Sequence, residues 1–183
     1  METTKNEMPP YAKTFFHNLS KYIDNKFYFF GSIQRNDYFP NSSDIDADLF
    51  TDNEQGDILK MQNFLGVKKY QFRRFFYRLH KTNKLVRGHK IKYIDETNNF
   101  MTEISVYNQK DKEDVLLEHN SKVELPFYIS FFLIILKTLY YNVKIIPDDT
   151  YIYFKKLLMN HMVEGRDTEF VGVDILEQSH YEK

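Results

Sequence analysis

The chain has 183 residues, of which 42% are hydrophobic and 17% aromatic, so it can bury a sizeable core and is not a disordered protein. It has no cysteine, which excludes a disulfide scaffold, a cysteine nucleophile and thiolate zinc sites. The formal net charge of −1 is close to neutral and by itself indicates neither a basic nor an acidic partner.

The charges are distributed unevenly along the chain. Ten of the 25 lysines and arginines lie between Lys68 and Lys92, a segment without aspartate or glutamate, so the rest of the chain carries 15 basic and all 26 acidic residues. A basic segment in an otherwise acidic protein indicates a phosphate-rich partner, and a nucleic-acid acceptor is the candidate. The alternative is a solvated face that binds no ligand.

The sequence contains no pattern of a targeting or membrane segment. Residues 1–14 lack the basic and then apolar order of a secretory signal. The uncharged apolar run 127–136 has ten residues, which is too short to span a bilayer and is typical of a buried helix. We therefore expect an intracellular, cytoplasmic protein that does not enter a membrane.

The first half of the chain begins with a helix and two strands. Apolar residues at every fourth position predict an amphipathic helix over residues 11–24. The apolar run 26–30 predicts a buried strand that ends at Gly31. The polar residues that follow predict either a loop or a turn of helix and then a loop, and residues 44–50 predict a second strand.

A second helix is expected over residues 51–65. Thr51 or Asp52 is the expected cap at its start, and Gly66 is the expected end. Its apolar face is predicted to consist of Ile58, Leu59, Met61 and Leu65.

The pattern changes to strands between residues 69 and 107. Residues 89–95 and 100–108 alternate apolar and polar side chains and predict an antiparallel hairpin around the polar turn "ETNN". The preceding "YQFRRFFYRLH" also favours a strand. Its aromatic residues are typical either of core packing on one strand face or of a surface that stacks bases.

The chain after residue 108 has the pattern of helices. Residues 125–142 are apolar on all faces, which predicts a central helix. Residues 147–162 predict a further helix with an apolar face made of Ile152, Phe154, Leu157, Leu158 and Met162. The expected fold class is α+β, with a small mixed β-sheet flanked by helices over residues 1–108 and a helical C-terminal part over residues 109–183 packed on it.

Three aspartates at alternate positions form the most informative pattern in the sequence. Asp44, Asp46 and Asp48 would crowd one face of a strand, where like charges repel and raise each other's pKa. Divalent cations offset such a cluster, because Mg²⁺ prefers one or two carboxylates together with substrate phosphates. Glu103, a charged residue within the predicted strand 100–108, is the candidate for a third carboxylate.

A glycine and a serine stand just before the aspartates in "FFGSIQRNDYFPNSSDIDADLF". Gly31 permits an unusual backbone angle and the close approach of a ligand. Ser32 opens a turn whose N–H groups and hydroxyl can hold a phosphate. The sequence thus predicts a phosphate cradle next to a metal site.

This combination resembles the nucleotidyltransferase superfamily of DNA polymerase beta-like enzymes, over about residues 11–108. The resemblance implies that Gly31 and Ser32 bind a triphosphate, that Asp44 and Asp46 bind Mg²⁺ or Mn²⁺, and that Arg35 corresponds to a loop arginine of many members. The implied site therefore consists of Gly31, Ser32, Arg35, Asp44, Asp46 and Glu103. The family more often has aspartate at the third carboxylate position, and Glu103 is one methylene longer.

The implied reaction transfers a nucleoside monophosphate from an NTP to an acceptor hydroxyl and releases pyrophosphate. One alternative is a degenerate member that binds nucleotide or nucleic acid without turnover, and another is a non-enzymatic interaction protein. Asp48 has no fixed role in the family, and we interpret it as an edge or supporting residue. The six histidines are expected to be surface or hydrogen-bonded residues, because none are spaced as metal ligands.

Overall fold

The computed structural model describes residues 2–160 and 170–171. The helices are α1 (Pro10–Ile23), α2 (Glu54–Leu65), α3 (Lys112–Asn120), α4 (Phe127–Lys137) and α5 (Asp148–Asn160). The strands are β1 (Phe27–Phe30), β2 (Ile45–Thr51), β3 (Arg73–Arg78), β4 (Leu85–Asp95), β5 (Phe100–Asn108) and β6 (Phe170–Val171). Short helical turns are η1 (Gly31–Gln34), η2 (Lys69–Gln71), η3 (Gln109–Asp111) and η4 (Thr138–Asn142).

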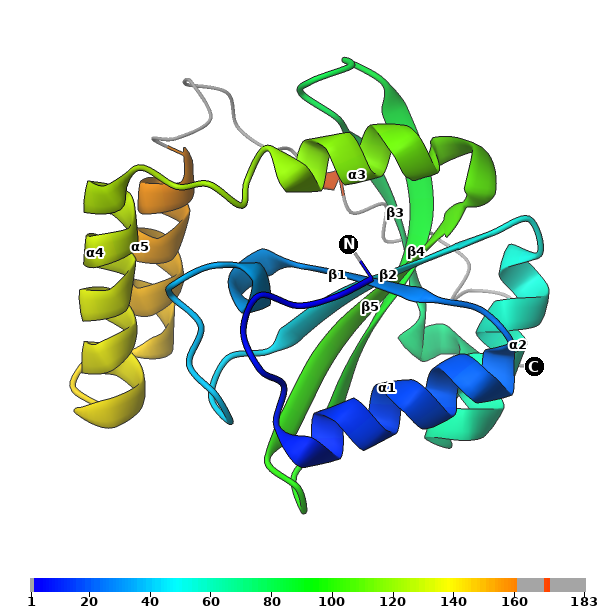
Figure 1. Cartoon of the computed structure of the whole chain (residues 1–183), viewed down its shortest axis with the longest axis horizontal. Coiled ribbons are helices and arrows are strands. Elements are labelled where there is room, and N and C mark those ends of the chain that lie inside the picture. Colours follow the sequence, from blue (N-terminus) through cyan, green and yellow to red (C-terminus); the bar gives the residue numbers. More distant parts are fainter. Residues whose placement is uncertain (1, 161–169, 172–183) are drawn as a thin grey trace, which may run out of the picture.

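The strands form one mixed sheet in the order β1-β2-β5-β4-β3-β6. Neighbouring strands are antiparallel except β2 and β5, which are parallel. Helices α1 and α2 cover one face of the sheet and α3 the other, while α4 and α5 lie side by side at one end (Figure 1). The predicted α+β class and the predicted hairpin of β4 and β5 are confirmed.

The larger hydrophobic core lies between the sheet and helices α1 and α2. Helix α1 contributes Phe15, Phe16 and Leu19, which are buried on one stripe, and the helix starts with Pro10 at a position that needs no N–H donor. A smaller core lies on the other face, where Val115 of α3 packs near β3 and β4. The two cores hold the sheet between helices.

Helix α2 corrects two details of the prediction. Its cap is Asn53, whose side-chain oxygen accepts a hydrogen bond from the Gly56 N–H, and not Thr51 or Asp52. Leu59, expected on the buried face, is exposed, because the buried face follows Ile58 and Met61 instead.

The expectation of a central helix over residues 125–142 was wrong. Helix α4 lies at the periphery, and only one side of it packs inward, against α5 and the β1–β2 loop. Apolar residues on its outer side, such as Phe127 (87% exposed) and Phe131 (58% exposed), lie on the surface. An apolar helix therefore does not by itself indicate a central position.

The apolar face predicted for α5 was also wrong. Ile152, Phe154 and Leu157 are exposed and Leu158 is half-buried, while Tyr151 is buried. Met162 lies outside the described residues. In the described part of the chain, no helix combines the length and the apolarity that a bilayer crossing requires. The division of the chain at residue 108 stays a prediction.

Candidate functional site

Gly31 marks the point where β1 ends and the turn η1 begins, with a φ of +71°. Asp46 of β2 pairs with Phe30, and a Cβ atom at residue 31 would lie 2.0 Å from Oδ2 of Asp46. Glycine is therefore needed here both for the positive φ and for space. The Asp46 carboxylate lies directly against the backbone of the turn that also carries Ser32.

Three carboxylates share one face of the sheet near this turn. Asp46 pairs with Glu103 across the parallel strands β2 and β5, and Asp44 immediately precedes β2. Burial raises the pKa of Asp46 well above its usual value, and the negative charges of Asp44 and Glu103 raise this pKa further. The positive charges of Lys155 and Arg35 have the opposite, smaller effect. The carboxylates thus lie close enough to repel one another.

A cavity of about 260 Å³ lies on this face of the sheet. The residues that the resemblance assigned to the site all line it: Gly31, Ser32, Arg35, Asp44, Asp46 and Glu103. They come from the β1–β2 loop, from β2 and from β5, which are far apart in sequence. The fold therefore brings the whole predicted set to one place, while the chemical role of each residue stays a prediction.

Basic side chains from the helical part also line the cavity, and sequence reasoning missed them. Lys155 comes from α5, and His119 and Lys122 come from α3 and the turn after it. The signal available for Lys155 was its spacing from Tyr151 and Met159, which places the three on one helix face. Basic groups and carboxylates thus line the same cavity, a distribution suited to an anionic ligand that is bound together with a cation.

Glu103 has a basic partner in the structure. The Nζ atom of Lys90, on β4, lies 3.1 Å from Oε1 of Glu103 and donates a hydrogen bond to it. Both side chains are about one-third exposed, so solvent screens the ion pair. Glu103 is thus shared between the carboxylate cluster and a lysine.

Asp48 is not an edge residue, which corrects the interpretation from sequence. It is fully buried on the same face as Asp46, and one of its oxygens lies 2.8 Å from Nε2 of His119. The His119 ring stacks on Phe30 with ring centres 3.9 Å apart. Burial raises the pKa of Asp48, and His119 counteracts the rise. The pair therefore forms a buried support between β2 and α3.

The basic segment 68–92 is split between the two faces of the sheet. Arg73 pairs with Lys90 across β3 and β4, so these side chains project to the face that carries the cavity. Arg74 pairs with His89 and projects to the opposite face. The predicted basic surface is therefore two surfaces, of which one borders the cavity.

The aromatic residues of the same segment belong mainly to the core. Phe72, Phe75 and Tyr77 are buried, while the neighbouring arginines are exposed. This arrangement favours core packing over a base-stacking surface, although Phe75 and Tyr77 also form part of the cavity wall.

The carboxylates at the cavity suit a hard divalent cation by their chemistry, but they do not form a complete metal site on their own. Asp44 and Asp46 supply two carboxylates whose mutual repulsion a cation would relieve, and phosphate oxygens of a substrate would complete the coordination. Within residues 2–160 and 170–171, however, no three acidic or histidine side chains lie together as a ready metal site. The pair Asp44 and Asp46 fits the ion together with substrate, while Glu103 is held by Lys90.

The comparison with protein families identifies the class of protein. The model of the nucleotidyltransferase domain matches residues 12–128, which is more than half of the chain, so the chain belongs to the nucleotidyltransferase domain family. The predicted resemblance is thereby confirmed.

Among solved structures, the chain is similar to the Cid1 poly(U) polymerase, at 14% sequence identity and a TM-score of 0.37. The match covers 73% of this chain and 42% of that protein, so this chain spans less than half of its length. No relative was found among curated proteins.

Proposed function

We propose that the protein transfers a nucleoside monophosphate from an NTP to an acceptor hydroxyl, with release of pyrophosphate and with Mg²⁺ or Mn²⁺ as cofactor. The observation that carries the proposal is the cavity, where Gly31 and Ser32 of the turn meet Asp44, Asp46 and Glu103. Membership of the nucleotidyltransferase domain family supports nucleotidyl transfer as the class of reaction.

Different residues around the cavity would bind the cation and the phosphates. Asp44 and Asp46 would hold the cation, which when bound neutralises phosphate charge and lowers the pKa of the attacking hydroxyl. Ser32 and the N–H groups of its turn would hold the triphosphate, because Gly31 lets a ligand approach the backbone. Lys155 faces the same cavity and would contribute positive charge to the triphosphate.

Glu103 would accept the proton of the acceptor hydroxyl once its carboxylate turns from Lys90 toward Asp44 and Asp46. The Lys90 ammonium would then face the developing negative charge near the cavity. Both side chains are partly exposed, so such a rearrangement requires no change in the sheet. Positioning and neutralisation by these groups are the main contributions a protein makes to phosphoryl transfer.

The acceptor would lie along the basic side chains next to the cavity. Arg73 pairs with Lys90, and Lys92 pairs with Glu103, so the exposed cations Arg73 and Lys92 project to the cavity face. A row of cations beside a phosphate site fits a polyanionic acceptor, and we propose a nucleic-acid end as its class.

The test is a product screen with the purified full chain. Each of the four ribonucleoside triphosphates is supplied with Mg²⁺ or Mn²⁺ and an RNA oligonucleotide, and both pyrophosphate release and the mass of the oligonucleotide are measured. We expect a mass increase of one or a few nucleotides, dependent on the cation. No pyrophosphate and no mass change with any triphosphate or cation would exclude this acceptor class and weaken the reaction proposed.

A second candidate function is favoured by one observation, the ion pair between Lys90 and Glu103. If this pair persists when nucleotide is bound, Glu103 stays with Lys90 and does not act as the third carboxylate of the site. The protein would then bind NTP without turnover. A wild type that binds a fluorescent NTP with Mg²⁺ but releases no pyrophosphate would support this function. Gain of turnover in Glu103→Asp, which has the shorter side chain, would support it further.

A further inference from the structure

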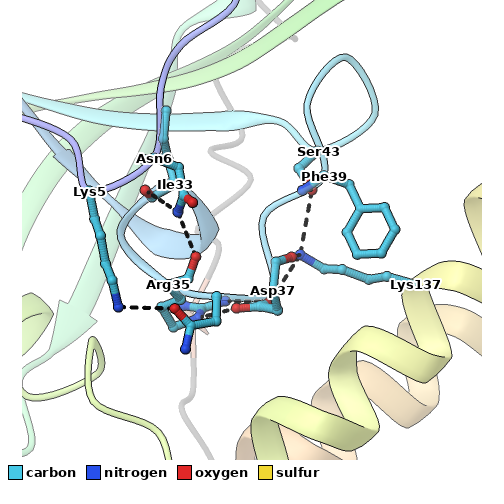
Figure 2. A network of polar contacts seen from close by, with 9 residues as sticks. Lys5, Asn6, Ile33, Arg35, Asp37, Phe39, Ser43 and Lys137 are labelled. Carbon is cyan, nitrogen blue, oxygen red and sulfur yellow. Dashed lines mark hydrogen bonds and ion pairs between the residues drawn. The ribbon is translucent and has the colours of Figure 1, made fainter.

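The loop between β1 and β2 contains a buried network of ionic side chains (Figure 2). The Asp37 carboxylate accepts hydrogen bonds from Nε and Nη2 of Arg35, at 2.8 and 3.2 Å. Its Oδ2 atom also lies 3.0 Å from Nζ of Lys137, which comes from α4. All three residues are more than nine-tenths buried. Two cations and one anion thus meet behind the turn that carries Ser32.

Lys137 contacts both ends of the loop segment that leads to Asp44. Its Nζ donates a 2.6 Å hydrogen bond to the backbone carbonyl of Asp37 and lies 3.5 Å from Oγ of Ser43. The same Oγ accepts a hydrogen bond from the Phe39 N–H, and the Ser43 N–H donates to the Phe39 carbonyl. Lys137 therefore fixes the position of the segment that immediately precedes Asp44.

The N-terminal segment holds the loop from the other side (Figure 2). The Asn6 side-chain amide donates hydrogen bonds to the backbone carbonyls of Ile33 and Arg35, at 2.9 and 2.6 Å. Lys5 donates through Nζ to the side chain of Asn36. The turn with Ser32 and the segment before Asp44 are thus each tied to a separate part of the fold.

Burying these charges has a cost that calls for an explanation. Lys137 is the one charged residue of helix α4, and this lysine is directed into the protein while several phenylalanines face solvent. Burial lowers the pKa of Lys137, and the neighbouring Asp37 opposes the shift. Replacing a buried ion pair with apolar residues is often neutral or stabilising, so a pair of this kind is weak evidence for a role in stability alone.

We propose that Asp37 and Lys137 are positioning residues of the nucleotide site, which hold the β1–β2 loop so that Ser32 and Asp44 face the same cavity. The inference rests on the proposed function and adds helix α4 to the site. Arg35, which the resemblance included in the site, then acts as a partner of Asp37 at the cavity wall. The arrangement explains why the single charge of α4 points away from solvent.

The test compares three variants of the full chain with the wild type. Lys137→Met keeps the length of the side chain and leaves Asp37 its Arg35 partner, so the variant is expected to fold. Asp37→Asn combined with Lys137→Met removes the charges of Asp37 and Lys137 together. Lys156→Met is the matched control, because this exposed lysine of α5 is not part of the network. Amide hydrogen exchange, nucleotide binding and steady-state turnover are measured for each.

We expect Lys137→Met and the double variant to exchange faster at residues 36–44 and unchanged in β4 and β5. We also expect kcat/KM to fall at least about tenfold, since small misplacements of catalytic groups have large effects on rate. The control should match the wild type. A purely structural role predicts a lower melting temperature with unchanged kcat and KM in the folded fraction.

The outcomes separate this inference from the proposed function. Unchanged exchange at residues 36–44, or faster exchange with unchanged kcat/KM in an active protein, would overturn the positioning role alone. A wild type that neither binds nor turns over any triphosphate would overturn the proposed function and the positioning role with it. Parallel loss in exchange protection and in kcat/KM, without loss in the control, supports both.

Discussion

The Asp46 carboxylate occupies the space that a side chain at Gly31 would need. An ideal Cβ atom there would lie 2.0 Å from Oδ2 of Asp46, far inside van der Waals contact. The glycine at the start of the turn η1 is therefore coupled to the Asp46 carboxylate on β2. A turn and a strand that carry two separate motifs in the sequence form one contact in the structure.

This coupling predicts the effect of Gly31→Ala. The added methyl group must displace the Asp46 carboxylate and also adopt a positive φ, so we expect nucleotide affinity to fall at least about tenfold, the effect of about 1.4 kcal/mol. Gly66→Ala is the matched control, because Gly66 has a φ of +65° with nothing within 4 Å of its Cβ position. Both variants should lose about 1 kcal/mol of stability from backbone strain, and only Gly31→Ala should lose binding. Equal nucleotide affinities of the two variants would contradict the coupling.

The raised pKa of Asp46 predicts a pH-dependent stability of the metal-free protein. Because its pKa is higher in the folded than in the unfolded state, ionisation favours unfolding, and the free energy of unfolding should fall as the pH rises from about 4 through the folded-state pKa. Asp46→Asn should remove this fall and raise stability at pH 7 by at least about 1 kcal/mol. Urea unfolding in EDTA between about pH 4 and pH 8, monitored by tyrosine fluorescence, measures the free energy of unfolding at each pH.

The control for this experiment is Asp52→Asn, since Asp52 is exposed. It should show the pH dependence of the wild type. A less stable Asp46→Asn protein at neutral pH, or an unchanged slope with pH, would show that Asp46 is not under electrostatic strain. Added Mg²⁺ with nucleotide should stabilise the wild type and not Asp46→Asn.

The buried contact between Asp48 and His119 predicts that losing the histidine alone destabilises the protein more than losing the histidine and the charge of Asp48 together. His119→Ala leaves the Asp48 carboxylate buried without its partner and should cost about 3 kcal/mol of unfolding free energy. Adding Asp48→Asn should recover part of this loss, because the buried charge is removed. Chemical denaturation measures both, with His17→Ala as an exposed control expected to change stability by less than about 0.5 kcal/mol. A double variant no more stable than His119→Ala would contradict this role.

The split of the basic segment predicts which lysines and arginines bind polynucleotide. Arg73→Ala with Lys92→Ala removes two cations from the cavity face, and Arg74→Ala with Arg78→Ala removes two from the other face. We expect the first pair to weaken RNA binding and to reduce the salt dependence of the binding constant by a slope of about 2. Fluorescence anisotropy across a salt series measures it. Equal weakening by both pairs would show that binding is not oriented toward the cavity.

The strands, and the set of residues that lines the cavity, could be predicted because they carry local patterns. The alternate aspartates and the Gly-Ser turn are visible within one segment, and Glu103 stands out as a charge in an apolar strand. The contributions of Lys155 and Lys137 could not be predicted, because they depend on how α4 and α5 pack against the rest of the fold. The spacing of Lys155 from Tyr151 and Met159 marks one helix face but not what that face contacts. The contact between Asp48 and His119 joins residues far apart in the sequence and could not be predicted for the same reason.

The placement of α4 shows a limit of hydropathy. A helix that is apolar on all faces is expected at the centre of a fold, yet α4 buries Ile129, Leu133 and Leu136 on one side and exposes the other. The composition of a helix gives the amount of its apolar surface. How much of that surface is buried depends on which elements pack against the helix. Large exposed apolar side chains also occur on folded proteins generally, so their burial cannot be read from residue type.

The central claim is that Asp44 and Asp46 hold the cation for nucleotidyl transfer. The most direct measurement follows the α-phosphate label of an NTP into an RNA acceptor, in the presence of Mg²⁺, for the wild type, Asp44→Ala and Asp46→Ala. We predict transfer by the wild type, loss of at least about 1,000-fold in both variants, and circular dichroism spectra that match the wild type. Transfer at the wild-type rate by either folded variant would contradict the assignment of the site.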